Sequence, residues 1–248
     1  EIMPSLVGSE MCIRDSNLIE MCKYEDGEMM GFKDSLDMPL EICPTYEALK
    51  LLDSFHKNNG LIRSKIKNFV MSHWNEESGI FKEMMTNSLR STKFALKTLK
   101  EIGEKEFIEE KVEEITDFMK KCWRENRKEG YFIPDNREDI KSITVTRYVL
   151  QSLEILYPHE EISELLEEMK IKDGEKKIKK FIHRSVDKRT GGYPMVEKLL
   201  PSLAGTFDAV DVMGNFFEDE EWIRKRSKEI TIFIENCKVG NGFVGYPT

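Results

Sequence analysis

Two helical patterns alternate along this chain at intervals of some fifty residues, and this repeat constrains the fold more than any other feature. The first pattern reads Ile-x-x-Phe followed by another apolar residue. Its apolar positions fall at i, i+3 and i+4, which is one stripe of an α-helix. A glycine beside an aromatic or large apolar residue follows each copy, as in Gly79-Ile80-Phe81, and predicts a tight turn. The copies begin at Ile66, Ile115, Ile178 and Ile230.

The second pattern reads Thr-x-x-Ala-Leu-x-x-Leu, with close apolar replacements, and again marks one face of a helix. Its copies begin at Thr45, Thr92, Thr146 and Thr206. A pair of such helices cannot bury both apolar stripes alone, so neighbouring pairs must stack. With the earlier turn at Gly31-Phe32, the sequence predicts an all-α fold of about four and a half stacked helical hairpins. The longer interval around residues 157–177 is predicted to be a surface excursion.

Composition and charge exclude several classes of protein. Hydrophobic residues make up 40% of the chain and charged residues 34%, which is too apolar for a disordered segment. The net charge of −8 argues against a nucleic-acid surface, and no apolar run is long enough to predict a membrane span. The cysteines have no paired spacing and predict reduced thiols in a cytoplasmic protein. They are Cys12, Cys22, Cys43, Cys122 and Cys237.

The order of helix, glycine-aromatic turn and threonine helix resembles the prenyltransferase and squalene-cyclase repeat family. The clearest copy runs from Gly191-Gly192-Tyr193-Pro194 through Pro201 to Thr206-Phe207-Asp208-Ala209-Val210. The resemblance implies an α/α toroid, in which inner helices follow the turns and line a central cavity. Members of the family include β subunits of protein prenyltransferases and class II terpene cyclases, and related toroids occur in non-catalytic binding domains.

Both ends of the chain carry expectations of their own. Residues 10–16 resemble a translated sequencing adapter, so residues 1–16 are predicted to be an artefactual leader. The toroid domain is then expected to cover residues 17–248. The final Gly242-Phe243 turn stands in the middle of a repeat, which predicts a domain truncated at its C-terminus.

The catalytic signatures of the family are not found in this sequence. Placing the zinc-binding cysteine of the prenyltransferases at the repeat threonine puts its aspartate partner at Cys43, Arg90, Thr144 and Ala204. None of these is Asp, and no Asp-x-Asp-Asp run of the cyclases occurs. No cofactor is therefore evident. Zinc is expected only if its ligands lie in further sequence, and whether the chain is an enzyme stays open.

Asp208 is the one candidate for an acid or a ligand contact. Its register is that of Glu47, Phe94 and Tyr148, which could face the cavity. The reading favoured here is a partly exposed helix carboxylate, because most Asp side chains are exposed. Asp211 shares its register with Lys50, Lys97 and Gln151 and is expected to face solvent.

A metal site is not predicted. His73, Cys122, Ser185 and Cys237 occupy one register of successive helices. Equivalent positions of neighbouring repeats are displaced around a ring, whereas zinc ligands must all lie about 2.0–2.3 Å from one ion. These residues are therefore interpreted as structural.

Four aromatic residues stand near the starts of the threonine helices. They could line an apolar cavity for an isoprenoid, or they could only pack hairpin on hairpin. The leading hypothesis is a prenyltransferase- or cyclase-like protein that binds or transfers an isoprenoid or another apolar small molecule. The alternative is a non-catalytic toroid that binds a protein partner, while a carbohydrate-active site would need a carboxylate pair that the sequence does not offer. The cavity candidates are Tyr46, Phe94, Tyr148 and Phe207.

Overall fold

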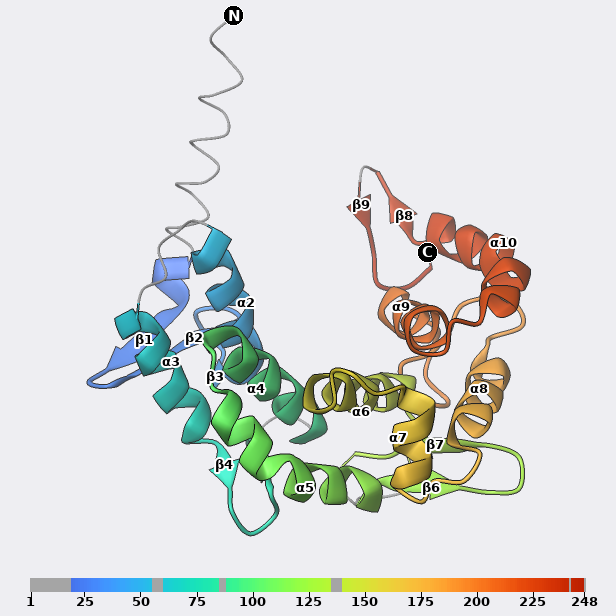
Figure 1. The fold of residues 1–248 in the computed structure, drawn as a ribbon. Coiled ribbons are helices and arrows are strands. Elements are labelled where there is room, and N and C mark those ends of the chain that lie inside the picture. The colour runs from blue at the N-terminus through green and yellow to red at the C-terminus, as the bar shows by residue number, and fades with distance from the viewer. Residues whose placement is uncertain (1–18, 55–59, 85–87, 135–139, 241, 248) are drawn as a thin grey trace, which may run out of the picture.

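The computed structural model describes residues 19–54, 60–84, 88–134, 140–240 and 242–247, and these form an open arc of paired helices (Figure 1). Successive inner helices pack side by side. They are α2 (Ile42–Ser54), α4 (Ser88–Ile102), α6 (Ile143–Leu156) and α9 (Leu203–Asp211). The outer helices are α3 (Gly60–Met71), α5 (Lys105–Lys121), α8 (Gly174–Ser185) and α10 (Glu220–Asn236). The predicted all-α fold of stacked hairpins is confirmed.

The segment expected to be a surface excursion contains a helix of its own. This helix, α7 (Ile162–Glu168), buries Ile162, Leu165 and Leu166 and packs against both α6 and α8. The excursion is therefore part of the core. A seven-residue helix has only two turns of apolar pattern, which is too short to be told from a loop by periodicity.

Four of the five glycine-aromatic turns belong to short antiparallel strand pairs, which the sequence analysis did not predict, while in the turn at Gly191-Gly192-Tyr193 only Tyr193 forms an isolated bridge, with Ser202. Each strand has at most five residues, so it offers almost no alternation to detect. Gly79 (φ +67°) adopts the left-handed conformation that glycine favours. The pairs are β1 (Lys23–Asp26) with β2 (Met29–Lys33), β4 (Trp74–Asn75) with β5 (Ile80–Phe81), β6 (Trp123–Glu125) with β7 (Gly130–Phe132), and β8 (Lys238–Val239) with β9 (Gly242–Phe243), while β3 (Leu40–Glu41) also pairs with β2.

The repeat threonines bind these turns to the inner helices. All four are buried, and in each copy Oγ1 accepts a hydrogen bond from the backbone N–H of the turn residue that packs beneath it. Because this register faces the turns, a cysteine placed here would not face the inner surface of the arc. The bonds run from Phe32 to Thr45 (2.9 Å), Phe81 to Thr92 (3.2 Å), Phe132 to Thr146 (3.2 Å) and Tyr193 to Thr206 (3.0 Å).

The apolar stripes of the two helix layers meet in one continuous core. Ala95 and Ala209 are fully buried, and a small side chain there allows adjacent helices to approach closely. The turn residues Phe32 and Phe81 are at most 1% exposed, whereas the equivalent Phe243 of the last hairpin is 58% exposed. No inner helix of the described chain covers Phe243, because α9 precedes this hairpin.

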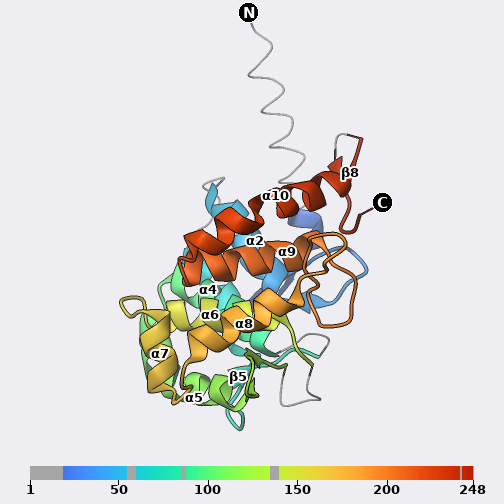
Figure 2. The ribbon, with the colours of Figure 1, turned by 90° about the vertical axis from the view of Figure 1, so that its right-hand side faces the viewer.

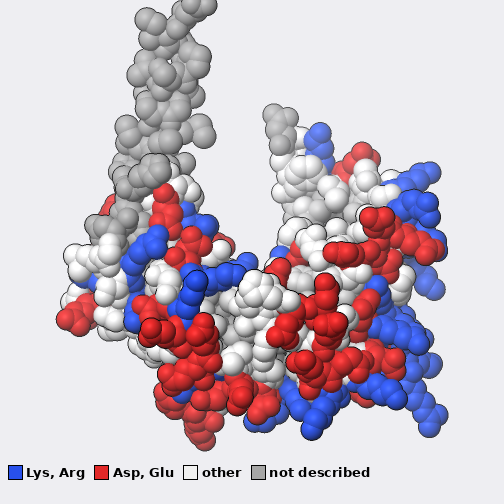
Figure 3. Space-filling model, viewed as in Figure 1, with Lys and Arg blue, Asp and Glu red and all other residues white. Residues whose placement is uncertain are grey.

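The arc encloses a hollow that opens on one side. The outer helices α3, α5, α8 and α10 lie on the outer side of the arc in Figure 1. In Figure 2, which views the molecule from the right of Figure 1, α8 and α10 lie in front of the inner helices. In the space-filling view the surface is hollowed between the N-terminal and C-terminal limbs, and most of the charge lies on the outer side (Figure 3). Among the described residues, no helix is long and apolar enough to cross a membrane.

Candidate functional site

The inner surface of the arc is defined by helix geometry. Each residue turns an α-helix by about 100°, so positions two and five after a repeat threonine point away from the outer layer. In α4 and α6 the second position is Phe94 and Tyr148, and the fifth is Lys97 and Gln151. We call this the concave face. The residue that directly follows each repeat threonine lies at the edge of the concave face, toward the neighbouring inner helix.

Aromatic rings and cations lie side by side on the concave face and at its edge. The ring centroids of Tyr46 and Phe94 are 5.8 Å apart. The Nζ of Lys93 lies 3.7 Å from the centroid of Phe94 and 4.5 Å from that of Tyr148. The Arg147 guanidinium lies 4.7 Å from the Phe207 centroid. The structure thus connects Tyr46, Phe94 and Tyr148 directly or through Lys93, while Phe207 contacts Arg147. We call these four rings the aromatic row; the sequence analysis had not selected the basic side chains beside them.

Lys93 is the most unusual of these groups. It is 4% exposed and forms no hydrogen bond or ion pair with another described residue. Burial, together with the nearby charges of Lys97 and Arg147, lowers the pKa of its amine to about 7. Burial and Arg147 also lower the pKa of Lys97. Asp208 acts in the opposite direction on Lys93, and Glu154 and Asp211 on Lys97, but burial is the largest effect on both amines. The face therefore holds two amines whose charged forms are disfavoured by burial.

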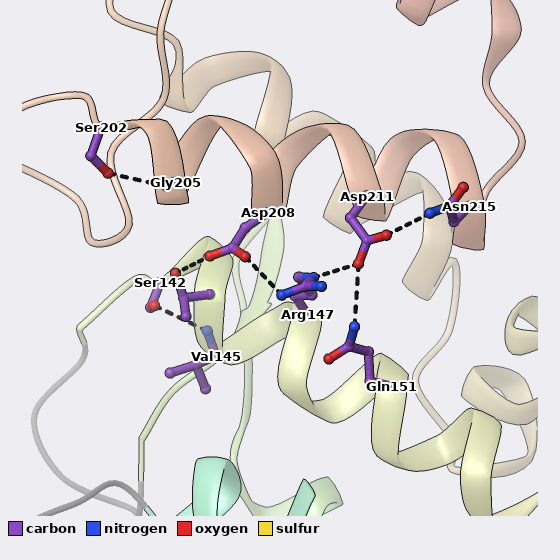
Figure 4. Close-up of polar contacts among 10 residues, drawn as sticks. Ser142, Val145, Arg147, Gln151, Ser202, Gly205, Asp208, Asp211 and Asn215 are labelled. Carbon is purple, nitrogen blue, oxygen red and sulfur yellow. Dashed lines mark hydrogen bonds and ion pairs between the residues drawn. The ribbon is translucent and has the colours of Figure 1, made fainter. Parts of the chain in front are cut away.

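Asp208 and Asp211 lie in a polar network between α6 and α9 (Figure 4). Nη1 of Arg147 lies 3.1 Å from Asp208, and its Nε donates to Asp211. Thr144 donates to Asp208 as well. Burial raises the pKa of Asp208, although the bonds from Thr144 and Arg147 oppose that shift. Arg147 therefore holds two carboxylates at one helix interface.

The expected exposure of both carboxylates is wrong. Asp208 is 4% and Asp211 9% exposed, because Arg147 and Gln151 of the neighbouring helix cover them. Asn215 adds a 2.5 Å bond to Asp211 from the π-helical turn η1 (Val212–Phe216), which continues α9. The register within α9 cannot reveal this cover, because the covering side chains belong to α6 of the preceding repeat.

Local caps fix where the two network helices begin. Ser142 accepts a hydrogen bond from the N–H of Val145 (3.1 Å), and Ser202 accepts one from Gly205 (3.0 Å). Serine is favoured at the N-cap because its oxygen satisfies a free helix N–H. These caps hold α6 and α9 in matching registers, so Arg147 meets both carboxylates (Figure 4).

The residues do not form a metal site. Cys122 and Cys237 are fully buried in separate repeats, and Nδ1 of His73 lies 2.9 Å from the backbone carbonyl of Phe69. In the part of the chain that the structure describes, no three His, Cys, Asp or Glu side chains are placed to hold a metal ion. The zinc site of the prenyltransferases therefore does not fit these residues.

Helical hairpins stacked in an arc, with inner helices that follow each glycine-aromatic turn, define an α/α toroid architecture. The family model described as the prenyltransferase alpha-alpha toroid domain matches residues 11–130 and 112–247. The chain therefore belongs to this family. The first match begins inside the segment predicted to be a leader, so that boundary stays a prediction.

Comparisons with individual proteins support the fold. No curated protein matches this chain. A solved structure, Candida albicans protein geranylgeranyltransferase-I complexed with GGPP, is similar with a TM-score of 0.65 and 18% identity. The similarity covers 96% of this chain and 72% of that chain. At this identity the match shows the shared toroid architecture.

Proposed function

We propose that the concave face binds an isoprenoid with an anionic head group, such as a prenyl diphosphate. The aromatic row would hold the apolar chain, and Lys93 with its neighbouring cations would hold the head group. The observation that carries this proposal is the position of Lys93, a buried and unpaired amine between two rings. The similar structure in complex with GGPP supports the ligand class.

The aromatic row suits a long apolar chain. Phe207 is 57% exposed, and Tyr46, Phe94 and Tyr148 are partly exposed. Apolar surface removed from water contributes roughly 25 cal/mol per Å². An isoprenoid laid across several rings would therefore gain affinity from each ring that it covers.

The cations suit an anionic head group. A buried amine without a counter-charge is destabilising, and a diphosphate would supply that charge. Binding would favour the protonated form of Lys93, so we expect proton uptake on binding and weaker binding above pH 7. Arg147 already engages two carboxylates, which leaves Lys93 and Lys97 as the available charges.

The proposal covers binding and not group transfer. Transfer to a thiol in this family uses zinc, and the described residues do not fit a zinc site. The alternative hypothesis of a non-catalytic binding module therefore stays open. It differs in what occupies the concave face, namely a protein partner instead of an isoprenoid.

Titration with a fluorescent geranylgeranyl diphosphate analogue tests the proposal. We expect saturable binding at pH 6.5 that falls at least tenfold in Lys93→Met. Lys100→Met is the matched control, because it removes an amine from the exposed side of the same helix. Geranylgeraniol, which lacks the head group, should bind Lys93→Met and the unchanged protein alike. No saturable binding by the folded protein would refute the proposal.

A further inference from the structure

Two outer helices carry exposed charges of opposite sign at the same spacing. On α8, Lys176, Lys180 and Arg184 follow at intervals of four and form the basic stripe. On α5, exposed acidic side chains repeat at the same interval and form the acidic stripe, Glu109, Glu113 and Asp117. Residues four apart share a helix face, and eight residues span about 12 Å. The two stripes therefore match in length.

The basic stripe is scarcely neutralised within the chain. Lys176 and Lys180 form no ion pair with another described residue, and Nη1 of Arg184 lies 3.7 Å from Glu129. The flanking Lys177, by contrast, lies 2.7 Å from Glu125. Like charges four residues apart destabilise a helix, so an external anion would reduce the repulsion within the basic stripe.

The acidic stripe is also unpaired among the described residues. Lys111, the basic residue in the middle of α5, lies 3.5 Å from Glu110 and 3.1 Å from Glu114. These two carboxylates belong to the adjacent row and leave the stripe itself without a cation. Negative charges four residues apart also destabilise a helix, so an external cation would stabilise the acidic stripe.

The surroundings of the basic stripe favour a narrow acidic partner over a broad anionic surface. An open groove of about 490 Å³ runs beside the stripe, and Lys176, Lys180 and Glu167 are among its lining residues. Asp173 and Glu175 also line this groove. A lipid bilayer or a nucleic acid would meet these carboxylates, whereas a single helix can contact the stripe alone.

We propose that the acidic stripe of one copy of this chain docks on the basic stripe of a second copy. The two helices lie at different places on the outer side of the arc (Figure 1), so the contact joins unlike surfaces. Contacts of this kind build rings or open chains. Because exposed ion pairs are individually weak and screened, the association is salt-sensitive.

Sedimentation velocity of the full chain tests this contact over a range of protein concentrations. In ~0.05 M salt the weight-average mass should rise with concentration, and in ~0.5 M salt it should stay at the monomer value. Lys176→Glu with Lys180→Glu should weaken association at least tenfold, as should Glu109→Lys with Glu113→Lys. The control for the basic reversal, Lys225→Glu with Lys228→Glu on α10, makes the same change in net charge as that reversal and should have no such effect.

The decisive variant combines both reversals in one chain. Because the stripes then exchange signs, the contact should form again and the low-salt association should return. Circular dichroism checks that each variant keeps its helix content. A monomer at every concentration in low salt would overturn the proposal, as would association that survives either single reversal or fails to return in the combined variant.

Discussion

Replacing Lys93 with Met should stabilise the protein while removing its proposed ligand contact. Methionine keeps an unbranched apolar side chain between Phe94 and Tyr148 but carries no charge to desolvate. The pKa of Lys93 falls from 10.5 to about 7 on folding. At about 1.4 kcal/mol per pH unit, this difference corresponds to a destabilisation of about 5 kcal/mol when the amine is charged in both states.

The effect depends on pH in a definite direction. Below pH 7 Lys93 is protonated in the folded and unfolded chains, so the full cost is present. Between pH 7 and 10.5 the unfolded chain still binds the proton while the folded chain does not, and the free energy of unfolding rises with pH. Between pH 6 and pH 9 the destabilisation caused by Lys93 therefore falls by about 2.5 kcal/mol.

Urea unfolding of the unchanged protein and Lys93→Met at both pH values measures this difference. We expect the variant to be more stable by about 2–5 kcal/mol at pH 6, and by about half as much at pH 9. Lys100→Met, on the exposed side of α4, should change stability by less than about 0.5 kcal/mol at either pH. An advantage of Lys93→Met that is equal at pH 6 and pH 9 would show that Lys93 titrates normally, and the reasoning would fail.

Three further substitutions test the framework around the concave face. Arg147→Met should lower the free energy of unfolding by about 3–5 kcal/mol because it leaves two buried carboxylates without their cation. Adding Asp208→Asn to the Arg147→Met chain should restore part of this loss. If the double variant is as unstable as Arg147→Met alone, the network is contradicted. Thr146→Val should cost about 1–3 kcal/mol by leaving the Phe132 N–H without an acceptor, whereas Thr146→Ser should cost less, as urea unfolding would show. Gly192→Ala would place a Cβ 2.4 Å from the Phe233 ring, so we expect its melting temperature to fall, while Gly60→Ala meets no atom within 4 Å and should melt like the unchanged protein.

The repeat pattern was sufficient to predict the architecture. Apolar residues at i, i+3 and i+4 recur in a fixed order, so each helix and its buried stripe follow from local periodicity. The threonines were correctly found as a register, but their role was not, since Thr146 binds Phe132 across a turn that periodicity does not show. The short strands and α7 were not predicted because their apolar patterns cover too few residues to be detected.

The candidate site was also predicted only in part. Helical periodicity is enough to show which residues share a helix face, and it places Phe94, Tyr148 and Asp208 in one register. The cover of Asp208 by Arg147, and the position of Lys93 between two rings without an ion pair, depend on how neighbouring helices pack. Burial, pKa and charge balance depend on side chains from the adjacent repeat, and helical periodicity carries no information about what a neighbouring helix brings to the interface.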